Sequence, residues 1–79
     1  MRLRKIQGFL QSRSLNFSYT EQEGLGSIDF EYRGIDYHIW EFFEEEYGAE
    51  SNVRNGGRQE DFYGDYEAEI LKILEGWKI

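Results

Sequence analysis

The sequence predicts a two-layer α+β domain: an N-terminal helix, a three- or four-stranded antiparallel meander and a C-terminal helix. Two observations predict this class. Both ends of the chain repeat apolar residues every three or four positions, as one face of a helix does. Between them, short segments alternate apolar and polar residues, as strands with one buried face do. Two helices packed on one face of such a sheet give two layers.

The first helix is expected at residues 2–12. Gly8 lies inside it and costs about 1 kcal/mol relative to alanine. The basic and polar residues of this segment fall on the side opposite its apolar stripe. The stripe would consist of Leu3, Ile6, Phe9 and Leu10.

Three alternating segments follow, at residues 15–20, 27–33 and 35–43, and a short fourth strand can return at 49–54. Gly34 marks a tight turn between the second and third segments, which therefore read as a hairpin. The inner face of the sheet would carry Leu15, Phe17, Tyr19, Ile28, Phe30, Tyr32, Tyr37, Ile39 and, at the far end, Phe43.

Charge favours one register for this hairpin. A turn at residues 33–34 would place Glu31 opposite Asp36, and like charges in that position destabilise a sheet. A turn at residues 34–35 would put glycine at the first central position of a type II′ turn and Glu31 opposite His38. We therefore expect the second register.

The C-terminal helix has clear start and stop signals. Asp65 is a candidate N-cap, and Gly76 stands where a helix would end. Glu67 and Glu69 lie in the positive first turn, where carboxylates are stabilising. The apolar stripe would be Tyr66, Ile70, Ile73 and Trp77, broadened by Leu74.

Length and composition bound the function. The chain has 79 residues, which we expect to form a single domain over residues 1–79, and it contains no cysteine. Its net charge is −7, with +4 in residues 1–13 and −11 in residues 14–79. An acidic body repels phosphate backbones, so we expect no direct nucleic-acid binding. No signal peptide or membrane span is evident, so we expect a soluble, cytoplasmic protein without membrane contact.

The outer face of the predicted sheet is the candidate partner-binding surface. Trp40 and Phe42 would stand there among charged residues, as in an interface core with a polar rim. The alternative is that a helix end, a loop or a second copy of the chain covers these rings. The predicted surface consists of Trp40, Phe42, Asp29, Glu31, Asp36 and His38, with Glu44, Glu45 and Glu46 in the following turn.

Two further groups of residues carry weaker functional signals. His38 opposite Glu31 would be half of a general-base arrangement, although no nucleophile accompanies it, so a surface ion pair is the plainer interpretation. Glycine-rich residues 54–58 could point backbone amides at an anion. That weak anion site would use Arg54, Gly56, Gly57 and Arg58; alternatively, the arginines pair with Glu60 and Asp61. We expect no metal and no cofactor, since the glutamate-rich turn lacks the spacing of a calcium loop.

Three strings carry a resemblance: YTEQEGLGSIDFEYRGIDYHIWEF, then ESNVRN and GDYEAEIL. Together they resemble a group of small acidic bacterial proteins carried on mobile genetic elements, over residues 19 to 72. That group has no assigned activity, so the resemblance transfers no functional residue. In size, charge and element order the chain is also loosely similar to small acidic anti-CRISPR proteins that block nuclease grooves.

The sequence thus favours a non-enzymatic acidic module that binds a basic protein partner, in its sharpest form a nucleic-acid mimic that inhibits a DNA-handling or defence enzyme. A small enzyme or ligand-binding domain that uses His38 with Glu31, or residues 54–58, is the first alternative. Self-association through the outer face is the second, so the chain could be a monomer or a homodimer.

Overall fold

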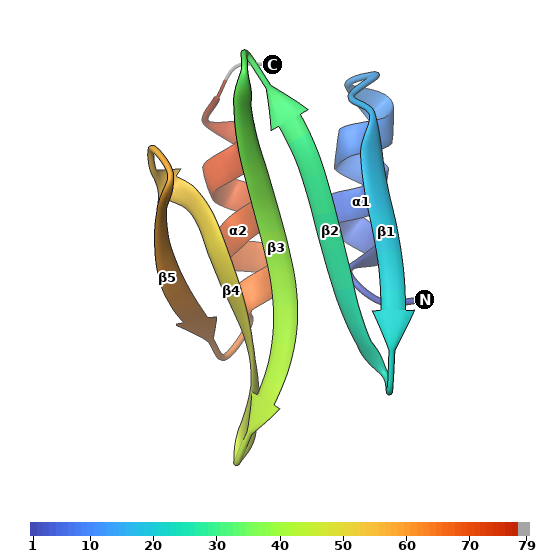
Figure 1. The fold of residues 1–79 in the computed structure, drawn as a ribbon, viewed down its shortest axis with the longest axis vertical. Coiled ribbons are helices and arrows are strands. Elements are labelled where there is room, and N and C mark those ends of the chain that lie inside the picture. Colours follow the sequence, from blue (N-terminus) through green and yellow to red (C-terminus); the bar gives the residue numbers. More distant parts are fainter. Residues whose placement is uncertain (78–79) are drawn as a thin grey trace.

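The computed structural model describes residues 1–77, and for Asn55 the backbone alone. It confirms an α+β fold: an N-terminal helix, an antiparallel meander and a C-terminal helix (Figure 1). The sheet has five strands rather than three or four, in the order β1-β2-β3-β4-β5. The elements are α1 Arg4–Ser12, β1 Phe17–Gln22, β2 Leu25–Tyr32, β3 Ile35–Glu44, β4 Glu46–Asn55, β5 Arg58–Tyr63 and α2 Tyr66–Glu75.

The fifth strand, β5, is the element that the sequence did not predict. Its residues are mostly polar and only Phe62 is buried, so it shows little of the alternation that marks a strand. The sequence signal for β5 was the glycine pair in the turn that precedes it. Gly56 and Gly57 both have positive φ, 59° and 105°, between the paired residues Asn55 and Arg58. Two central glycines with positive φ are typical of a two-residue hairpin turn rather than an open loop.

The register expected for the β2–β3 hairpin is wrong. The turn consists of Arg33 and Gly34, with φ of 52° and 81°, and Glu31 lies opposite Asp36. Positive φ at both central residues gives a turn whose twist matches that of the strands, and glycine adopts it at little cost. The like-charge pair is exposed to solvent, where charges repel weakly. Turn geometry therefore outweighs charge in this hairpin.

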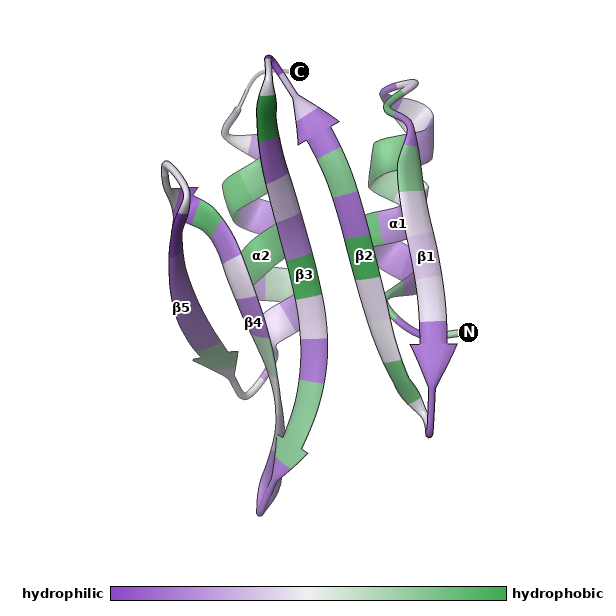
Figure 2. Ribbon diagram, viewed as in Figure 1, coloured by the Kyte–Doolittle hydropathy of each residue, from purple (hydrophilic) through white to green (hydrophobic). Residues whose placement is uncertain are grey.

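Both helices cover the same face of the sheet, and the core lies between them and the strands (Figure 1). Figure 2 shows the alternation that produces this face, as green and purple bands along β2 and β3. Phe43 is an exception to the expected inner face: it is 56% exposed because the β3–β4 hairpin extends past the helices. The largest fully buried apolar side chains are Ile6, Leu10, Ile28, Ile39, Ile70 and Leu74.

An aromatic cluster closes the end of the core beside the C-terminus of α2. The ring of Trp77 lies 4.7 Å from that of Tyr37, 5.5 Å from Tyr32 and 6.2 Å from Phe30. Such ring pairs contribute about 0.5–1.5 kcal/mol each beyond their area burial. These contacts hold Trp77, just after α2, against the β2–β3 hairpin.

The opposite end of the core contains a buried carboxylate. The side chain of Glu41 on β3 is only 2% exposed and accepts hydrogen bonds from the Arg2 guanidinium at 2.7 and 3.1 Å. The Gly26 backbone N–H also donates to it, at 2.8 Å, and so does the Tyr66 hydroxyl, at 2.5 Å. Burial alone would raise the pKa of Glu41, but these three donors outweigh it and hold the pKa below its ordinary value.

The basic N-terminal segment thus folds back on the acidic body. Besides the Arg2 contact, the Glu67 carboxylate of α2 accepts from the backbone N–H groups of Lys5 and Ile6, at 2.9 and 3.2 Å. These amides open α1 and have no partner within the helix. Its N-cap residue, Leu3, supplies no side-chain cap, so α2 provides the cap instead. α2 itself begins as expected, with Asp65 accepting from the Ala68 N–H.

We predict that Glu41→Gln destabilises the fold by about 2 kcal/mol at neutral pH, because Arg2 loses its partner. This value lies below that of a fully buried pair because Arg2 is partly exposed. The folded pKa of Glu41 lies below its unfolded value, so its contribution is present above about pH 4.3 and is lost as the pH falls through the folded pKa. Urea denaturation from pH 7 to pH 3 measures this.

The two proteins should therefore differ most at neutral pH and converge in acid. Glu44→Gln, in the exposed hairpin turn, is the matched control and should change the free energy of unfolding by less than about 0.5 kcal/mol. Equal stability of Glu41→Gln and wild type at pH 7 would contradict the assignment.

Candidate protein-binding surface

The outer face of the sheet, opposite the helices, has no covering element among residues 1–77 (Figure 1). Antiparallel sheets often leave one face to solvent, but that face is then usually polar. Here a row of aromatic side chains runs along β3 and onto β5, set among carboxylates. The residues of this outer surface are His38, Trp40, Phe42 and Tyr63, with Asp29, Glu31, Asp36 and Glu50 around them.

Trp40 lies at the centre of this surface and is 40% exposed. Its ring packs at a tilt against the imidazole of His38, with centroids 4.1 Å apart, and its indole Nε1–H donates to Asp29 Oδ1 at 3.1 Å. A large ring held on two sides loses little rotamer freedom when a partner covers it. Trp40 is therefore an exposed aromatic with a fixed orientation.

His38 is buried, at 8% exposure, beneath Trp40. Because the hairpin register differs from the expected one, His38 lies opposite Asp29 and not opposite Glu31. Its Nε2 is 3.2 Å from Glu50 Oε2, but the two atoms lack the alignment of a hydrogen bond. The acid–base pair expected of His38 and Glu31 is thus absent, and the nearest carboxylate is Glu50 of β4.

A glycine on the neighbouring strand leaves room for the Phe42 ring. It pairs with Gly48, and a Cβ at that position would lie 2.7 Å from Phe42 Cζ and 2.9 Å from the Phe62 carbonyl oxygen. The missing side chain lets the Phe42 ring cross β4 and meet Tyr63 edge-on, with centroids 5.7 Å apart. Tyr63 is 46% exposed and extends the aromatic row onto β5.

The end of the β3–β4 hairpin, residues 43–47, projects beyond the helices and carries the expected glutamates (Figure 1). Glu44, Glu45 and Glu46 are all exposed. The rings of Phe43 and Tyr47 meet edge-on, with centroids 4.9 Å apart, on the inner side of this end, and the Arg2 guanidinium lies 5.1 Å from the centre of the Tyr47 ring. The hairpin end therefore presents aromatic rings on both faces of an acidic turn.

The electrostatic field at this end is negative. The pKa of Tyr63 is raised by its desolvation and by the carboxylates of Asp61, Glu44 and Glu46. A phenol resists ionisation where negative charge is already dense. The field that perturbs Tyr63 would equally attract a cationic group on a partner.

Side chains of β4 support the strand beneath His38. Pairing between β3 and β4 runs only as far as Ile39 and Ser51, and β4 then shifts its register. Beyond that point the Asn52 amide replaces a backbone partner: its Oδ1 accepts from the His38 N–H at 2.9 Å, and its Nδ2 donates to the Asp36 carbonyl at 3.0 Å. The surface is thereby held on a fixed strand.

The glycine-rich turn shows a different arrangement from an anion site. Arg54 forms ion pairs with Glu60 and Glu69, and its guanidinium lies 4.9 Å from the Phe62 ring. The expected pairing with Glu60 is thus present. Gly56 and Gly57 form the β4–β5 turn, and Arg58 is exposed beside them. The Arg54 guanidinium is therefore paired with carboxylates and is not directed at an anion-binding site formed by the glycine turn.

No protein-family model, curated protein or solved structure matches this chain, so its own residues carry the functional argument. Within residues 1–77, no helix is both long enough and apolar enough to cross a membrane. Across the same described residues, no group of three or more acidic or histidine side chains is placed to hold a metal ion. The outer surface and the hairpin end are therefore the strongest candidate site.

Sequence reasoning missed two residues of the outer surface, Glu50 and Tyr63, and one of the hairpin end, Tyr47. Glu50 and Tyr63 belong to strands that were shortened or missed, so their faces could not be assigned. Tyr47 directly follows the glutamates that the sequence predicts in a turn, whereas it pairs with Phe43 at the start of β4. Recognising Gly56-Gly57 as a hairpin turn would have placed Tyr63 and Glu50 on the same face as Trp40 and Phe42.

We predict that Gly48→Ala destabilises the protein by about 1–3 kcal/mol, because the new methyl group overlaps the Phe42 ring and the Phe62 carbonyl. Chemical denaturation measures the change. The matched control is Gly8→Ala: an added Cβ at this helical position meets no atom within 4 Å, and the variant should be more stable by up to about 1 kcal/mol. A Gly48→Ala protein as stable as wild type would show that Phe42 does not rest on Gly48.

Proposed function

We propose that the protein is a non-enzymatic binding module whose outer surface and acidic hairpin end dock onto a basic protein. The observation that carries this proposal is the uncovered sheet face with fixed aromatic rings among carboxylates. A ring left partly at the surface contributes less to folding than a fully buried one, whereas interface hot spots are enriched in Trp and Tyr.

The aromatic row would supply the anchors. Trp40 is held by His38 and Asp29, and Phe42 by Gly48 and Tyr63, so the rings are oriented before a partner arrives. Pre-organised side chains lower the entropic cost of association. These contacts support a rigid docking face.

The carboxylates would supply steering. Asp29, Glu31 and Asp36 lie on the same face as the anchors, and residues 44–46 project beyond it. A charge of −7 on 79 residues favours encounter with a basic partner and disfavours an acidic one. In the sharpest form of the proposal, these carboxylates stand in for phosphates and occupy the basic groove of a DNA-handling or defence enzyme. Such a role would suit a protein of the mobile-element kind that the sequence resembles.

The enzymatic alternative has less support. A general base must reach a substrate proton, and His38 is buried beneath Trp40 with Glu50, not Glu31, beside it. Self-association through the same face remains the second candidate, because the aromatic row would equally fit another copy. The charge of the body opposes that arrangement.

We predict that Trp40→Ala/Phe42→Ala weakens binding to the basic partner at least about tenfold, because it removes both anchors. The measurement is affinity capture from a lysate of the encoding cell, followed by titration of the captured protein. The control is Ile35→Ala, which truncates an exposed apolar side chain at the opposite end of β3 and should bind within about threefold of wild type. Circular dichroism establishes that each variant folds.

If the protein blocks a nucleic-acid-binding groove, two further properties of the same complex are expected. Wild-type binding should weaken steeply between about 50 and 200 mM salt and should compete with duplex DNA. Neutralising the exposed turn by Glu44→Gln, Glu45→Gln and Glu46→Gln should weaken it without affecting the fold. Binding to the partner that duplex DNA does not reduce would contradict the mimicry. An unchanged affinity of the Trp40→Ala/Phe42→Ala variant would contradict the docking face itself.

A further inference from the structure

The outer edge of the sheet at β1 has unused backbone hydrogen-bonding groups. Gln22 and Leu25 flank a two-residue turn and therefore exchange backbone hydrogen bonds with each other. Pairing alternates along the strand, so Phe17, Tyr19 and Glu21 direct their N–H and C=O groups away from β2. No described element lies along this side of β1 (Figure 1).

This edge lacks the usual protection against pairing. Proteins guard sheet edges with charges, proline or bulges. The other edge, β5, is charged by Arg58, Glu60 and Asp61. In contrast, the outer-face side chains of β1 are uncharged: Ser18, Thr20 and Gln22.

The one charge on β1 is already engaged. The Glu21 carboxylate accepts from the Tyr19 hydroxyl at 2.6 Å and lies 3.6 Å from the N-terminal amine. It belongs to the contacts that hold the N-terminus and does not project across the edge as a guard. β1 is therefore the unguarded edge of the sheet.

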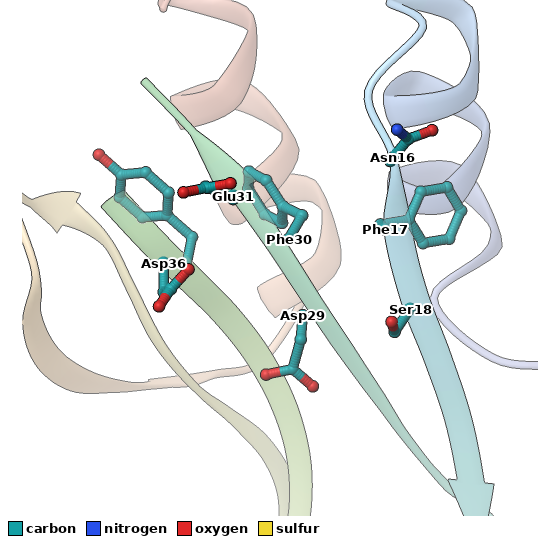
Figure 3. A pocket seen from close by; sticks show the side chains of 8 residues that line it. Asn16, Phe17, Ser18, Asp29, Phe30, Glu31 and Asp36 are labelled. Atoms are coloured by element: carbon teal, nitrogen blue, oxygen red, sulfur yellow. The ribbon is translucent and has the colours of Figure 1, made fainter. Parts of the chain in front are cut away.

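A hollow of about 510 Å³ lies beside this edge, over β1, β2 and the start of β3 (Figure 3). Three of its lining residues are carboxylates: Asp29, Glu31 and Asp36. None of the three forms an ion pair with another described residue. Across the β1–β2 ladder, Asp29 faces Ser18, whose small side chain leaves the approach from the edge open.

We propose that β1 accepts an extended, basic segment of a partner protein by strand addition. The added strand would pair with the outward groups of Phe17, Tyr19 and Glu21. Alternate side chains of that strand would lie on the outer face, about 4.8 Å beyond Ser18. A lysine or arginine there is long enough to pass over Ser18 and place its charge in the acidic hollow.

Charge complementarity selects this occupant over a second copy of the chain. Pairing β1 with β1 would join two bodies of net charge −7 and set two acidic hollows side by side. A basic segment neutralises the hollow instead. This edge contact shares Asp29, Glu31 and Asp36 with the outer surface but does not use the Trp40 and Phe42 rings, so either proposal can hold if the other fails.

The test uses three short acetylated and amidated peptides on the whole protein. One alternates lysine with threonine, one alternates lysine with proline, and one alternates glutamate with threonine. The lysine–threonine peptide should bind and should slow amide hydrogen exchange at Phe17, Tyr19 and Glu21 by at least about tenfold. The lysine–proline peptide has the same charge but lacks half of the N–H donors, so it should bind at least about tenfold more weakly.

Matched variants locate the contact. Glu21→Pro removes one outward N–H from an edge strand, where proline is tolerated, and should weaken the lysine–threonine peptide about tenfold. Glu21→Ala removes the same carboxylate but keeps the N–H, and should bind within about threefold of wild type. Asp29→Asn/Asp36→Asn should weaken binding about tenfold through lost charge. Phe42→Ala should leave it unchanged, which separates this proposal from the aromatic surface.

Several results would overturn the proposal. Equal affinity for the lysine–proline and lysine–threonine peptides would show attraction by charge alone. Failure of the lysine–threonine peptide to bind would overturn the proposal. So would protection from hydrogen exchange that appears on β3 instead of β1. A dimer in light scattering with β1 amides already protected would mean that a second copy occupies the edge.

Discussion

The Glu41 carboxylate is the interaction on which most of the structure depends. It lies on the inner face of the sheet, where burial disfavours a charge unless donors surround it. The donors come from three other places: Arg2 before α1, Gly26 at the start of β2 and Tyr66 at the start of α2. One buried charge therefore ties the N-terminus, two strands and the last helix into a single arrangement. It holds the N-terminal segment and the start of α2 against the inner face of the sheet.

Local patterns account for the parts of the fold that the sequence predicted. The apolar stripes of α1 and α2 and the alternation of β2 and β3 depend only on neighbouring residues, as does the Asp65 cap. The β2–β3 register was predicted wrongly because two local signals conflicted, and the Arg33-Gly34 turn outweighed the repulsion of an exposed Glu31–Asp36 pair. β5 was missed because an edge strand with one buried residue has almost no alternation to detect.

The candidate site, too, has a part that local patterns predict and a part that they do not. Alternation places Trp40 and Phe42 on the outer face, where the structure also has them. The surroundings of these rings depend on strands that are distant in sequence: Glu50 beside His38, Gly48 beneath Phe42 and Tyr63 beyond it. Glu41 was detectable only as an anomaly, a charged residue between two inward positions. Its partner Arg2 lies 39 residues away, and no local rule connects them.

The two tryptophans of the chain lie on opposite sides of the sheet, and this separates their fluorescence. Trp77 is packed among Tyr32, Tyr37 and Phe30, so its emission follows the integrity of the core. Trp40 is at the surface against the His38 imidazole, so its emission follows contacts made at the outer face. A molecule with one indole in each environment reports its folding and its surface contacts through separate intrinsic signals, with no label attached.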